Sequence, residues 1–493
     1  MGFDTVKHQL KQSLGASNHD LTNGKVDHLT AEASNSVPVN RPKKRIAVIG
    51  SGVSGLSAAW LLSKAHDVVV FERDHRLGGH ANTVDVPVTY ADGRQETVGV
   101  DAGFIVFNRK NYPNLTALLS HLNVAVEDTC MSFGASLDNG RIEYSGQDLS
   151  ALFSNRRSIL SPTHWAMLRD IPRFHRHARL ALEIGNYGEM GGDATMGDFV
   201  RTHGYSQSFV QHFLQPFAAA IWSTPSTRVM DYAAASLLKF FDNHGLLQIL
   251  NMPLWNTVSG GSRSYVSAIK RELADNAIRL NAPVKSVARL ERGVVVHLAD
   301  GIEQQFDDVV LATHADDALR LLEAPTSEEK RILGAFGYQP NKALVHTDPR
   351  AMPVRRRAWS SWNYMGGGKD VAVSYWMNRL QNFTCDTDIF VTLNPHQDLE
   401  DKHIVAEFDY THPTFNLAAA RAQEEIWSLQ GEGGVWFCGA HFGQGFHEDG
   451  LQAGLAVAEA LGGVRRPWEV DNESGRIFLR DEGGRVNGEI EAA

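Results

Sequence analysis

The feature that most constrains this chain is a glycine triplet between a strand-like run and a helix-like run. RIAVIG is rich in β-branched residues, which is typical of a buried strand, and SGLSAAWLLSKA has helical spacing. Gly50, Gly52 and Gly55 lie between them with the spacing GxGxxG. The first glycine permits a tight turn, the second lets a pyrophosphate approach the backbone, and the third lets helix and strand pack closely. The segment therefore predicts a strand–turn–helix unit that binds a nucleotide at the helix N-terminus.

Two further features select the nucleotide. Glu72 ends the next apolar run, DVVVFE, about 20 residues on, where a carboxylate holds ribose hydroxyls. Arg76, Gly78 and Gly79 follow so closely that they must fold back over the same phosphates. NAD domains do not need this second loop, whereas the extended FAD molecule does, so we expect FAD, with Arg76 as a cation near the pyrophosphate. The alternatives are a glycine-rich turn that only packs helix on strand, and an arginine that is only a surface charge.

The C-terminal segment GAHFGQGFHEDGLQAGLAVAEAL independently favours a flavin. Its glycines keep a loop free of side chains, and a predicted helix begins near Glu448. A helix N-terminus at this place could stabilise negative charge on a reduced flavin. His441 and His447 flank the loop and could move a proton at neutral pH. The alternatives are an ordinary capped helix and histidines that only make hydrogen bonds.

Composition limits the class of protein. The 493-residue chain has a formal net charge of -10, which argues against nucleic acid as a partner. Its three cysteines, Cys130, Cys385 and Cys438, are far apart, which fits a reducing compartment without disulfides, and no clustered His/Cys pattern suggests a metal. We find neither an apolar segment long enough for a bilayer nor a secretory signal, and expect a cytoplasmic protein, with attachment at the inner membrane face as an option. The oligomeric state stays open.

Strand and helix patterns alternate at both ends and in the middle of the chain, with a helical stretch and a β-rich stretch between them. This order predicts an α/β fold, in which a Rossmann-like FAD-binding domain with a parallel sheet carries an inserted α+β substrate domain. The predicted parts are a disordered N-terminal arm (1–43), the FAD-binding domain (44–110, 256–320 and 431–465), a helical substrate part (111–255), a β-rich substrate part (321–430) and a C-terminal tail (466–493), which has little to bury from Glu469 onward.

From Arg45 to Gly463 the sequence resembles the flavin-containing amine oxidase superfamily, which includes monoamine oxidases, phytoene desaturases and polyenoic fatty acid isomerases. ERDHRLGGH, GVDAGFIVF, TVSGGSRSYVSAI and VVLATHA occur in the superfamily's order. HTDPRAMPVRRRAWSSWNY and GFHEDGL also resemble a bacterial group of predicted FAD-binding proteins that is often associated with cyclopropane fatty acid synthases. The resemblance implies a flavin-dependent oxidoreductase.

The resemblance also implies individual roles. Val284 matches the valine that contacts adenine, and Asp101 and Gly103 match the segment beneath the flavin. Lys342 matches the lysine that holds a water against flavin N5, although a lysine that opens a strand is most often solvated. The complete set of predicted cofactor contacts is Gly50, Gly52, Ser54, Gly55, Glu72, Arg73, Arg76, Gly78, Gly79, Asp101, Gly103, Val284, Gly439, Ala440, Glu448, Gly450 and Leu451; the catalytic candidates are Lys342, His441 and His447.

Two departures from the superfamily matter. Ala440 and His441 stand where an acidic residue usually contacts the cofactor, so backbone groups or His441 must replace that contact. The cysteine that carries covalent flavin in monoamine oxidases is absent from the last loop, so we expect non-covalent FAD and regard Cys438 as a small buried hydrophobe.

The substrate is less constrained. A flavin accepts a hydride, and the single dinucleotide motif favours reoxidation by oxygen, a quinone or another protein. The segment 153–180 interleaves arginines with apolar residues, which suits a helix on an anionic bilayer or, equally, a solvated basic face. We expect dehydrogenation of a lipid-like, fatty acyl substrate. The alternatives are an amine oxidase whose aromatic walls are Trp359, Trp362, Tyr364, Tyr375, Trp376 and Phe446, a redox-neutral double-bond isomerase, and an FAD-binding accessory protein of a lipid-modifying enzyme.

Overall fold

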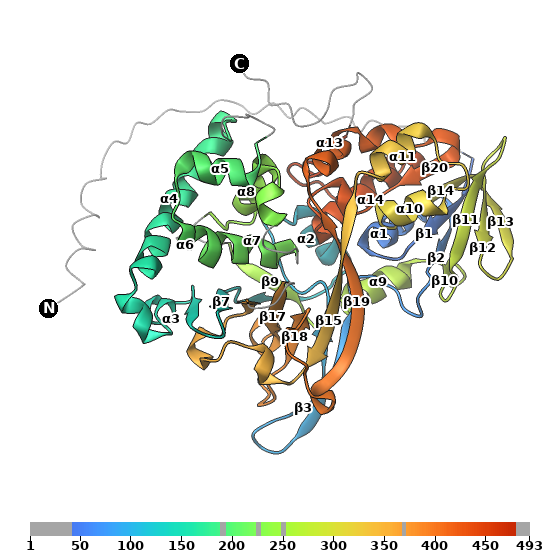
Figure 1. The fold of residues 1–493 in the computed structure, drawn as a ribbon. Helices are drawn as coiled ribbons and strands as arrows, with labels where there is room; N and C mark the ends of the chain where they lie inside the picture. The colour runs from blue at the N-terminus through green and yellow to red at the C-terminus, as the bar shows by residue number, and fades with distance from the viewer. Residues whose placement is uncertain (1–41, 188–193, 223–227, 248–252, 367–370, 480–493) are drawn as a thin grey trace, which may run out of the picture. The chain divides into compact units, whose positions relative to one another are not determined.

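The structure is a computed structural model that describes residues 42–187, 194–222, 228–247, 253–366 and 371–479 (Figure 1). Residues 1–42 and 43–493 form separate units, and all elements named below belong to the second. The predicted N-terminal arm, with the short helix expected in VKHQLKQSL, lies outside the described residues except for its last two positions.

The first domain is built on a five-stranded parallel sheet, as the alternating patterns predict. Its strands in spatial order are β10 (Ile278–Arg279), β2 (Asp67–Phe71), β1 (Arg45–Ile49), β14 (Asp308–Leu311) and β20 (Val435–Phe437). In the central strand, Ile46, Ala47 and Val48 have no exposed surface. A parallel strand covered on both faces is continuously apolar instead of alternating, which explains the run RIAVIG.

The first and last helices of the domain, α1 (Val53–Leu62) and α14 (His447–Gly462), pack against each other beside this sheet (Figure 1). A Cβ at Gly454 would lie 2.2 Å from the carbonyl oxygen of Ser54, so this close approach requires glycine. The remaining elements here are α9 (Arg263–Glu272), α10 (Ala315–Leu321), β11 (Val284–Arg289), β12 (Val294–Leu298) and β13 (Glu303–Phe306).

The core of this domain extends beyond the predicted ranges. Helices α2 (Pro113–His121), α11 (Ser327–Leu333) and α13 (Leu417–Glu425), which the sequence assigned to the substrate domain, bury apolar residues in it. The predicted tail also contributes, which corrects the expectation that it has little to bury. Ile477 is 2% exposed, and the Trp468 ring stacks on Trp60 with 5.7 Å between centroids.

The second domain has a seven-stranded mixed sheet covered by helices. The strands in spatial order are β19 (Ile404–Thr414), β15 (Gly337–His346), β18 (Phe390–Leu393), β17 (Ala372–Trp376), β16 (Trp362–Met365), β7 (Phe133–Leu137) and β8 (Ile142–Ser145). The helices are α3 (Leu149–Leu152), α4 (Pro162–Ile184), α5 (Met196–His203), α6 (Gln207–Phe209), α7 (Gln215–Trp222) and α8 (Ala234–Asn243). Phe174, Phe217 and Trp362 lie in the shared core, so helices and sheet form one body.

Two small sheets complete the described fold: β3 (Thr83–Thr89) with β4 (Gln95–Asp101), and β5 (Phe107–Asn108) with β9 (Trp255–Val258) and β6 (Val126–Thr129). A short helix, α12 (Met377–Leu380), follows β17. In the part of the chain that the structure describes, no helix combines the length and the apolar character needed to cross a membrane.

Candidate functional site

The glycine triplet forms the turn between β1 and α1. Gly50 has φ +102°, which disfavours other residues, and its N–H donates to the carbonyl of Phe71 at 2.9 Å. A Cβ at Gly55 would lie 2.0 Å from the carbonyl oxygen of Gly50. A Cβ at Gly52, in contrast, would meet no atom within 4 Å. Gly50 and Gly55 are therefore required by the fold, whereas Gly52 leaves the backbone open toward a ligand.

The second glycine loop folds back onto the first. The N–H of Gly78 donates to the carbonyl of Ser51 at 3.0 Å, and a Cβ at Gly79 would lie 3.2 Å from the Cα of Gly52. The Arg76 guanidinium donates through Nη1 to the carbonyl of Gly79 at 2.8 Å. The loop predicted from RLGGH thus lies beside Gly52, with a cation within it.

Glu72 ends β2 at the same edge of the sheet. Its carboxylate is buried and accepts hydrogen bonds from the N–H and Oγ of Ser51 and from the N–H of Asp74, at 2.9, 2.5 and 3.0 Å. The backbone carbonyl of Glu72 accepts from the N–H of Ala282 at 2.9 Å, two residues before Val284 begins β11. The residues predicted for the ribose and adenine therefore lie near one strand end, while the adjacent Arg73 is exposed.

The last helix reaches the same place. A Cβ at Gly450 would lie 2.9 Å from Cγ1 of Val53 and 3.6 Å from the backbone nitrogen of Ala440. The N-termini of α1 and α14 are therefore neighbours, although they come from opposite ends of the chain. Ser54 and Leu451 are buried on this interface, and Gly439 lies against the His441 ring.

Asp101 and Gly103 hold the segment that follows β4. The Asp101 carboxylate is buried and accepts from the Oγ1 of Thr83 at 2.7 Å and from the N–H and Oγ of Ser262 at 2.9 and 2.7 Å. Burial outweighs these bonds and raises the pKa of Asp101 to about 6. A Cβ at Gly103 would lie 2.3 Å from the carbonyl oxygen of His80. Both residues therefore position the chain, which gives no geometric support to a direct cofactor contact by the Asp101 carboxylate.

His447 opens α14 in an apolar surrounding. Its Nε2 lies 2.6 Å from the Oη of Tyr265, and its ring stacks on Phe104 with 3.8 Å between centroids and 9° between planes. Burial lowers the pKa of His447 to about 3, so its imidazole is neutral at physiological pH. Phe104 belongs to the GVDAGFIVF segment, which places His447 beside the part of the chain expected beneath the flavin.

Two predicted site residues are engaged elsewhere. Lys342 lies on β15 with its side chain half exposed, and its Nζ forms an ion pair with Glu407 on the neighbouring strand at 2.5 Å. The Glu448 carboxylate is buried and accepts from the N–H groups of Asn114 and Leu115, both at 3.0 Å, at the start of α2. Both side chains therefore bond to other parts of the protein. The catalytic role of Lys342 and the cofactor contact of Glu448 stay predictions without geometric support.

The predicted aromatic walls separate into two groups. Trp362, Tyr364, Tyr375 and Phe446 pack with the helices in the second core, whereas Trp359 and Trp376 pack with Phe390 in another cluster. The arrangement does not form one cage from all six rings.

A histidine cluster between the two domains was missed by the sequence interpretation. The His80 ring stacks on Tyr410 with 4.7 Å between centroids, and lies 5.5 Å from His412 and 6.3 Å from His314. Burial and the neighbouring histidines lower the pKa of His80 well below its usual value. The sequence contains one indication of a role for His80, which directly follows Gly79 of the second glycine loop. Only the fold shows that His314 and His412, more than 200 positions away, lie beside it.

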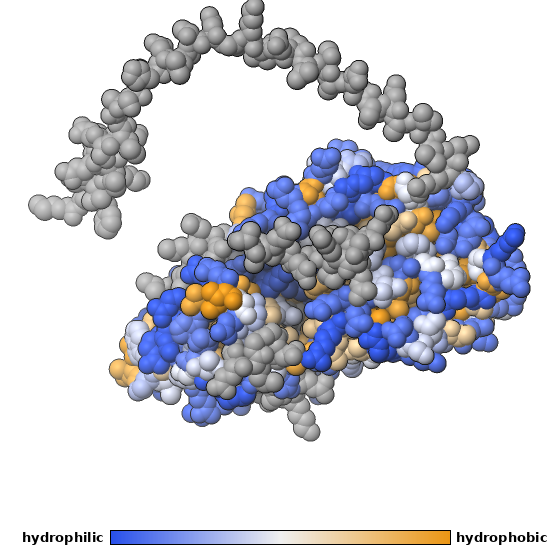
Figure 2. Space-filling view, turned by 90° about the horizontal axis from the view of Figure 1, so that it is seen from above, coloured by the Kyte–Doolittle hydropathy of each residue, from blue (hydrophilic) through white to orange (hydrophobic). Residues whose placement is uncertain are grey.

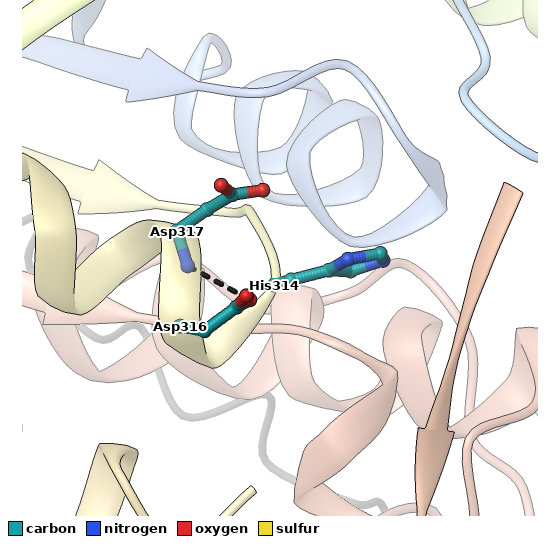
Figure 3. A group of neighbouring side chains, drawn as sticks. All are labelled: His314, Asp316 and Asp317. Carbon is teal, nitrogen blue, oxygen red and sulfur yellow. Dashed lines mark hydrogen bonds between the residues drawn. The ribbon is translucent and has the colours of Figure 1, made fainter. Parts of the chain in front are cut away.

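Figure 3 shows His314, Asp316 and Asp317 at the start of α10, a group close enough to hold a cation. Each member already has a partner. His314 Nδ1 lies 3.0 Å from the Oγ1 of Thr411, and the Arg320 guanidinium pairs with both carboxylates. Because its members are already paired, this group gives no reason to propose a metal site.

The residues around the two glycine loops fit an FAD molecule. Besides the open backbone at Gly52, Nε2 of His80 and Nε2 of His441 are buried and have no hydrogen-bond partner among the described residues. Buried polar atoms are normally paired, so these two nitrogens, on the residues that follow Gly79 and Ala440, indicate a polar ligand at this place. A dinucleotide with phosphates and a polar ring system meets that need.

Comparison with known proteins defines the class. The family described as flavin containing amine oxidoreductase matches residues 53–379, and the chain belongs to this family. It is 25% identical over 356 residues to an L-amino-acid oxidase of Mus musculus, a match that covers 67% of this chain and 50% of that protein. It is also 42% identical over 57 residues to a bilirubin reductase of Mediterraneibacter gnavus, which covers 11% of this chain and 9% of that protein. The chain thus spans half the length, or less, of these curated relatives.

Solved structures share the fold. A wild-type putrescine oxidase bound to putrescine has a TM-score of 0.59 at 16% identity, covering 85% of this chain and 99% of that one. A CLA-producing fatty acid isomerase from P. acnes has a TM-score of 0.57 at 16% identity, covering 85% and 98%. These neighbours agree with the α/β fold, and the family, which is described as flavin containing, agrees with FAD as the cofactor.

Proposed function

We propose that this chain is an FAD-dependent oxidoreductase that removes a hydride from a lipid-like, fatty acyl substrate, which it takes from the surface of an anionic membrane. The oxidoreductase part is supported by the family and by the fit of the site to FAD. The lipid part is supported chiefly by one observation, the composition of the exposed face of α4.

Helix α4 has a buried and an exposed face at helical spacing. Met167, Phe174 and Ala178 point into the second core with 1% or less of their surface exposed. The opposite face presents basic and large apolar side chains together with the single acid Glu183; its exposed basic and apolar members are Trp165, Arg169, Arg176, Arg179, Leu180 and Ile184. A helix whose outer face mixes arginines with large apolar residues suits the boundary between headgroups and acyl chains.

The apolar residues on this face are strongly exposed. Trp165 is 51% and Ile184 62% exposed, and in the turn before the helix Leu160 is 87% exposed. Figure 2, the view from above, shows separate hydrophobic patches within a mostly hydrophilic surface. The acid inside the helix, Asp170, is buried against Arg169 and Arg173 and offsets part of their charge, so the positive charge of the outer face comes mainly from Arg176 and Arg179. Exposed arginines there would attract anionic lipids by about 1 kcal/mol each near the surface.

FAD, when bound, supplies hydride-accepting chemistry. The residues of this chain shape the environment of the candidate flavin site. The N-terminus of α14 lies beside the N-terminus of α1, and its helix dipole favours negative charge at that end. His447 is held neutral by burial and bonded to Tyr265, so it can orient a polar group by a hydrogen bond without adding charge, and Phe104 covers its ring. These apolar neighbours also limit the access of water.

Anaerobic mixing of the FAD-loaded protein with bacterial phospholipid and free fatty acids tests the reaction. We expect bleaching of the flavin absorption band together with a new double bond in the lipid. An unbleached flavin with a shifted double bond would overturn dehydrogenation in favour of isomerisation, and no change in either would favour an accessory role. Bleaching by putrescine but not by lipid would overturn the lipid class in favour of a small amine.

Vesicle binding tests the membrane contact separately. We expect the protein to sediment with phosphatidylglycerol vesicles, and much less with phosphatidylcholine. Arg169→Glu, Arg176→Glu and Arg179→Glu together should reduce sedimentation by at least about tenfold, since each charge adds about 1 kcal/mol. Arg94→Glu, an exposed arginine on the β3–β4 hairpin, is the matched control. Equal sedimentation of both variants would contradict the contact.

A further inference from the structure

Three buried side-chain N–H donors belong to residues where β5 meets β9 and in the turn that follows β5. Asn108 and Trp255 are direct neighbours in this antiparallel pair, so their side chains share one face of the small sheet. The backbone N–H of Asn111 donates to the Oδ1 of Asn108 at 3.0 Å, which places the Asn111 backbone beside the Asn108 amide. We call these three residues the donor cluster.

The donors of the cluster are unpaired. Nδ2 of Asn108, Nδ2 of Asn111 and Nε1 of Trp255 find no hydrogen-bond partner among the described residues, although the three residues are only 0, 9 and 8% exposed. The orientation of the Asn108 amide follows from its bond to Asn111, because Oδ1 must be the acceptor. A buried N–H donor without an acceptor is unfavourable, so these unpaired donors indicate a ligand that accepts hydrogen bonds.

The other face of the same strand pair shows the contrast. Asn256, which stands next to Trp255 and opposite Phe107, donates through Nδ2 to the Oδ1 of Asp128 at 2.8 Å. An asparagine amide in this sheet therefore finds a protein acceptor on one face and lacks one on the other. Within this strand pair the unpaired donors lie on the face that carries Asn108 and Trp255, whereas on the other face the Oδ1 of Asn256 has no donor among the described residues.

We propose that the donor cluster binds the carboxylate of the substrate. A carboxylate offers about four lone-pair sites and can accept from all three N–H groups, whereas a hydroxyl offers two lone pairs and an ammonium none. The Arg476 guanidinium donates to the backbone carbonyl of Asn111 at 2.9 Å and adds a positive group nearby, although Asp449 pairs with it. This inference rests on the proposed function and narrows its substrate class to free carboxylic acids.

The segment 104–112, which contains Asn108 and Asn111, is connected to α14 by ring contacts. Phe104, four residues before Asn108, stacks on His447 at the start of α14 and lies 6.4 Å from the ring of Phe107. Phe107 in turn lies 6.1 Å from Tyr112. Arg476 donates both to the Asn111 carbonyl and to the Asp449 carboxylate of α14, so the turn that carries Asn111 is also joined to the start of α14 by hydrogen bonds.

Titration of the FAD-loaded protein with decanoate, decanol and decylamine, followed by perturbation of the flavin spectrum, tests the proposal. We expect decanoate to bind more tightly than the other two. Asn108→Asp keeps the acceptor for Asn111 but removes the donor and adds like charge, and should weaken decanoate binding at least about tenfold, as should Trp255→Phe. Trp436→Phe is the matched control, because its indole already donates to Asp308. FAD content and thermal midpoint, measured on every variant, report folding.

Decanoate binding that is equal in the wild type, Asn108→Asp and Trp255→Phe would overturn the proposal and leave the donors to ordered water. Tighter binding of decanol or decylamine would overturn the choice of carboxylate. The two proposals can fail separately. If decanoate binds through the cluster but no lipid bleaches the flavin, the carboxylate site is supported and the proposed reaction is refuted. If lipids bleach the flavin equally in all variants, the proposed reaction is supported and the carboxylate site is refuted.

Discussion

The two ends of the candidate flavin site are built differently. At the pyrophosphate end, Gly52 and Gly79 approach within contact distance, so backbone meets backbone. At the ring end, Tyr265 and His447 meet although 182 residues separate them, and their side chains provide the contact. The first end therefore depends on the absence of side chains in short motifs, and the second on the packing of distant segments. Substitutions should remove the cofactor at the first end and only tune its chemistry at the second.

The largest effect is expected from the glycines. Gly52→Val should abolish FAD binding while the apoprotein folds, because a side chain there meets no protein atom but occupies the place of the phosphates. Gly55→Val should instead destabilise the protein by several kcal/mol or prevent folding, because its Cβ would lie 2.0 Å from a backbone oxygen. FAD content and urea unfolding measure the two effects. Gly146→Ala, with no atom closer than 3.7 Å, is the control; full FAD content in Gly52→Val would refute the site assignment.

A second prediction concerns acid stability. Burial lowers the pKa of His412 to about 4 and of His441 and His447 to about 3, so between these values and their unfolded pKa near 6.5 only the unfolded chain binds the protons. Stability should therefore fall as the pH drops below 6.5, by about 1.4 kcal/mol per pH unit for each histidine. Asp101 acts in the opposite direction between pH 3.8 and about 6, because its folded pKa is raised.

Urea unfolding of the apoprotein at pH 7.5 and pH 5 measures this loss. His447→Gln should reduce the difference between the two pH values, and His75→Gln, an exposed histidine, should not. Equal stability at both pH values would mean that these rings are not neutral and buried together.

A third prediction sharpens the ring end. Tyr265→Phe removes the hydroxyl that bonds to His447 and keeps the ring, so FAD content should stay unchanged. The rate of flavin reduction should fall about fivefold, since one hydrogen bond contributes about 1 kcal/mol. Stopped-flow absorbance under anaerobic conditions measures the rate. An unchanged rate would remove His447 from the list of catalytic candidates.

The smallest effect is expected from Lys342. Because its Nζ is paired with Glu407 on an exposed part of the sheet, Lys342→Met should change the rate of flavin reduction by less than about twofold. The same stopped-flow assay applies. A loss of a hundredfold or more would restore the catalytic role that the resemblance implies and would show that the side chain moves when the cofactor binds.

The same contrast explains what the sequence could predict. Gly50, Gly52, Gly55, Glu72 and the RLGGH loop lie within 36 residues, and local spacing sufficed for their arrangement. Residue type alone could not predict the orientation of Lys342 or Glu448. That orientation depends on which residue, distant in the sequence, packs beside each side chain in the fold. For the same reason no local pattern could have indicated that Asn108 and Trp255 would be neighbours with unpaired donors.

The central claim is that loops from both ends of the chain hold one FAD without a covalent bond. The most direct measurement is the flavin content of the purified protein before and after heat denaturation and filtration. We predict one FAD per chain, released completely into the filtrate. A colourless protein that takes up no FAD, or a flavin that stays attached to the denatured chain, would contradict the account.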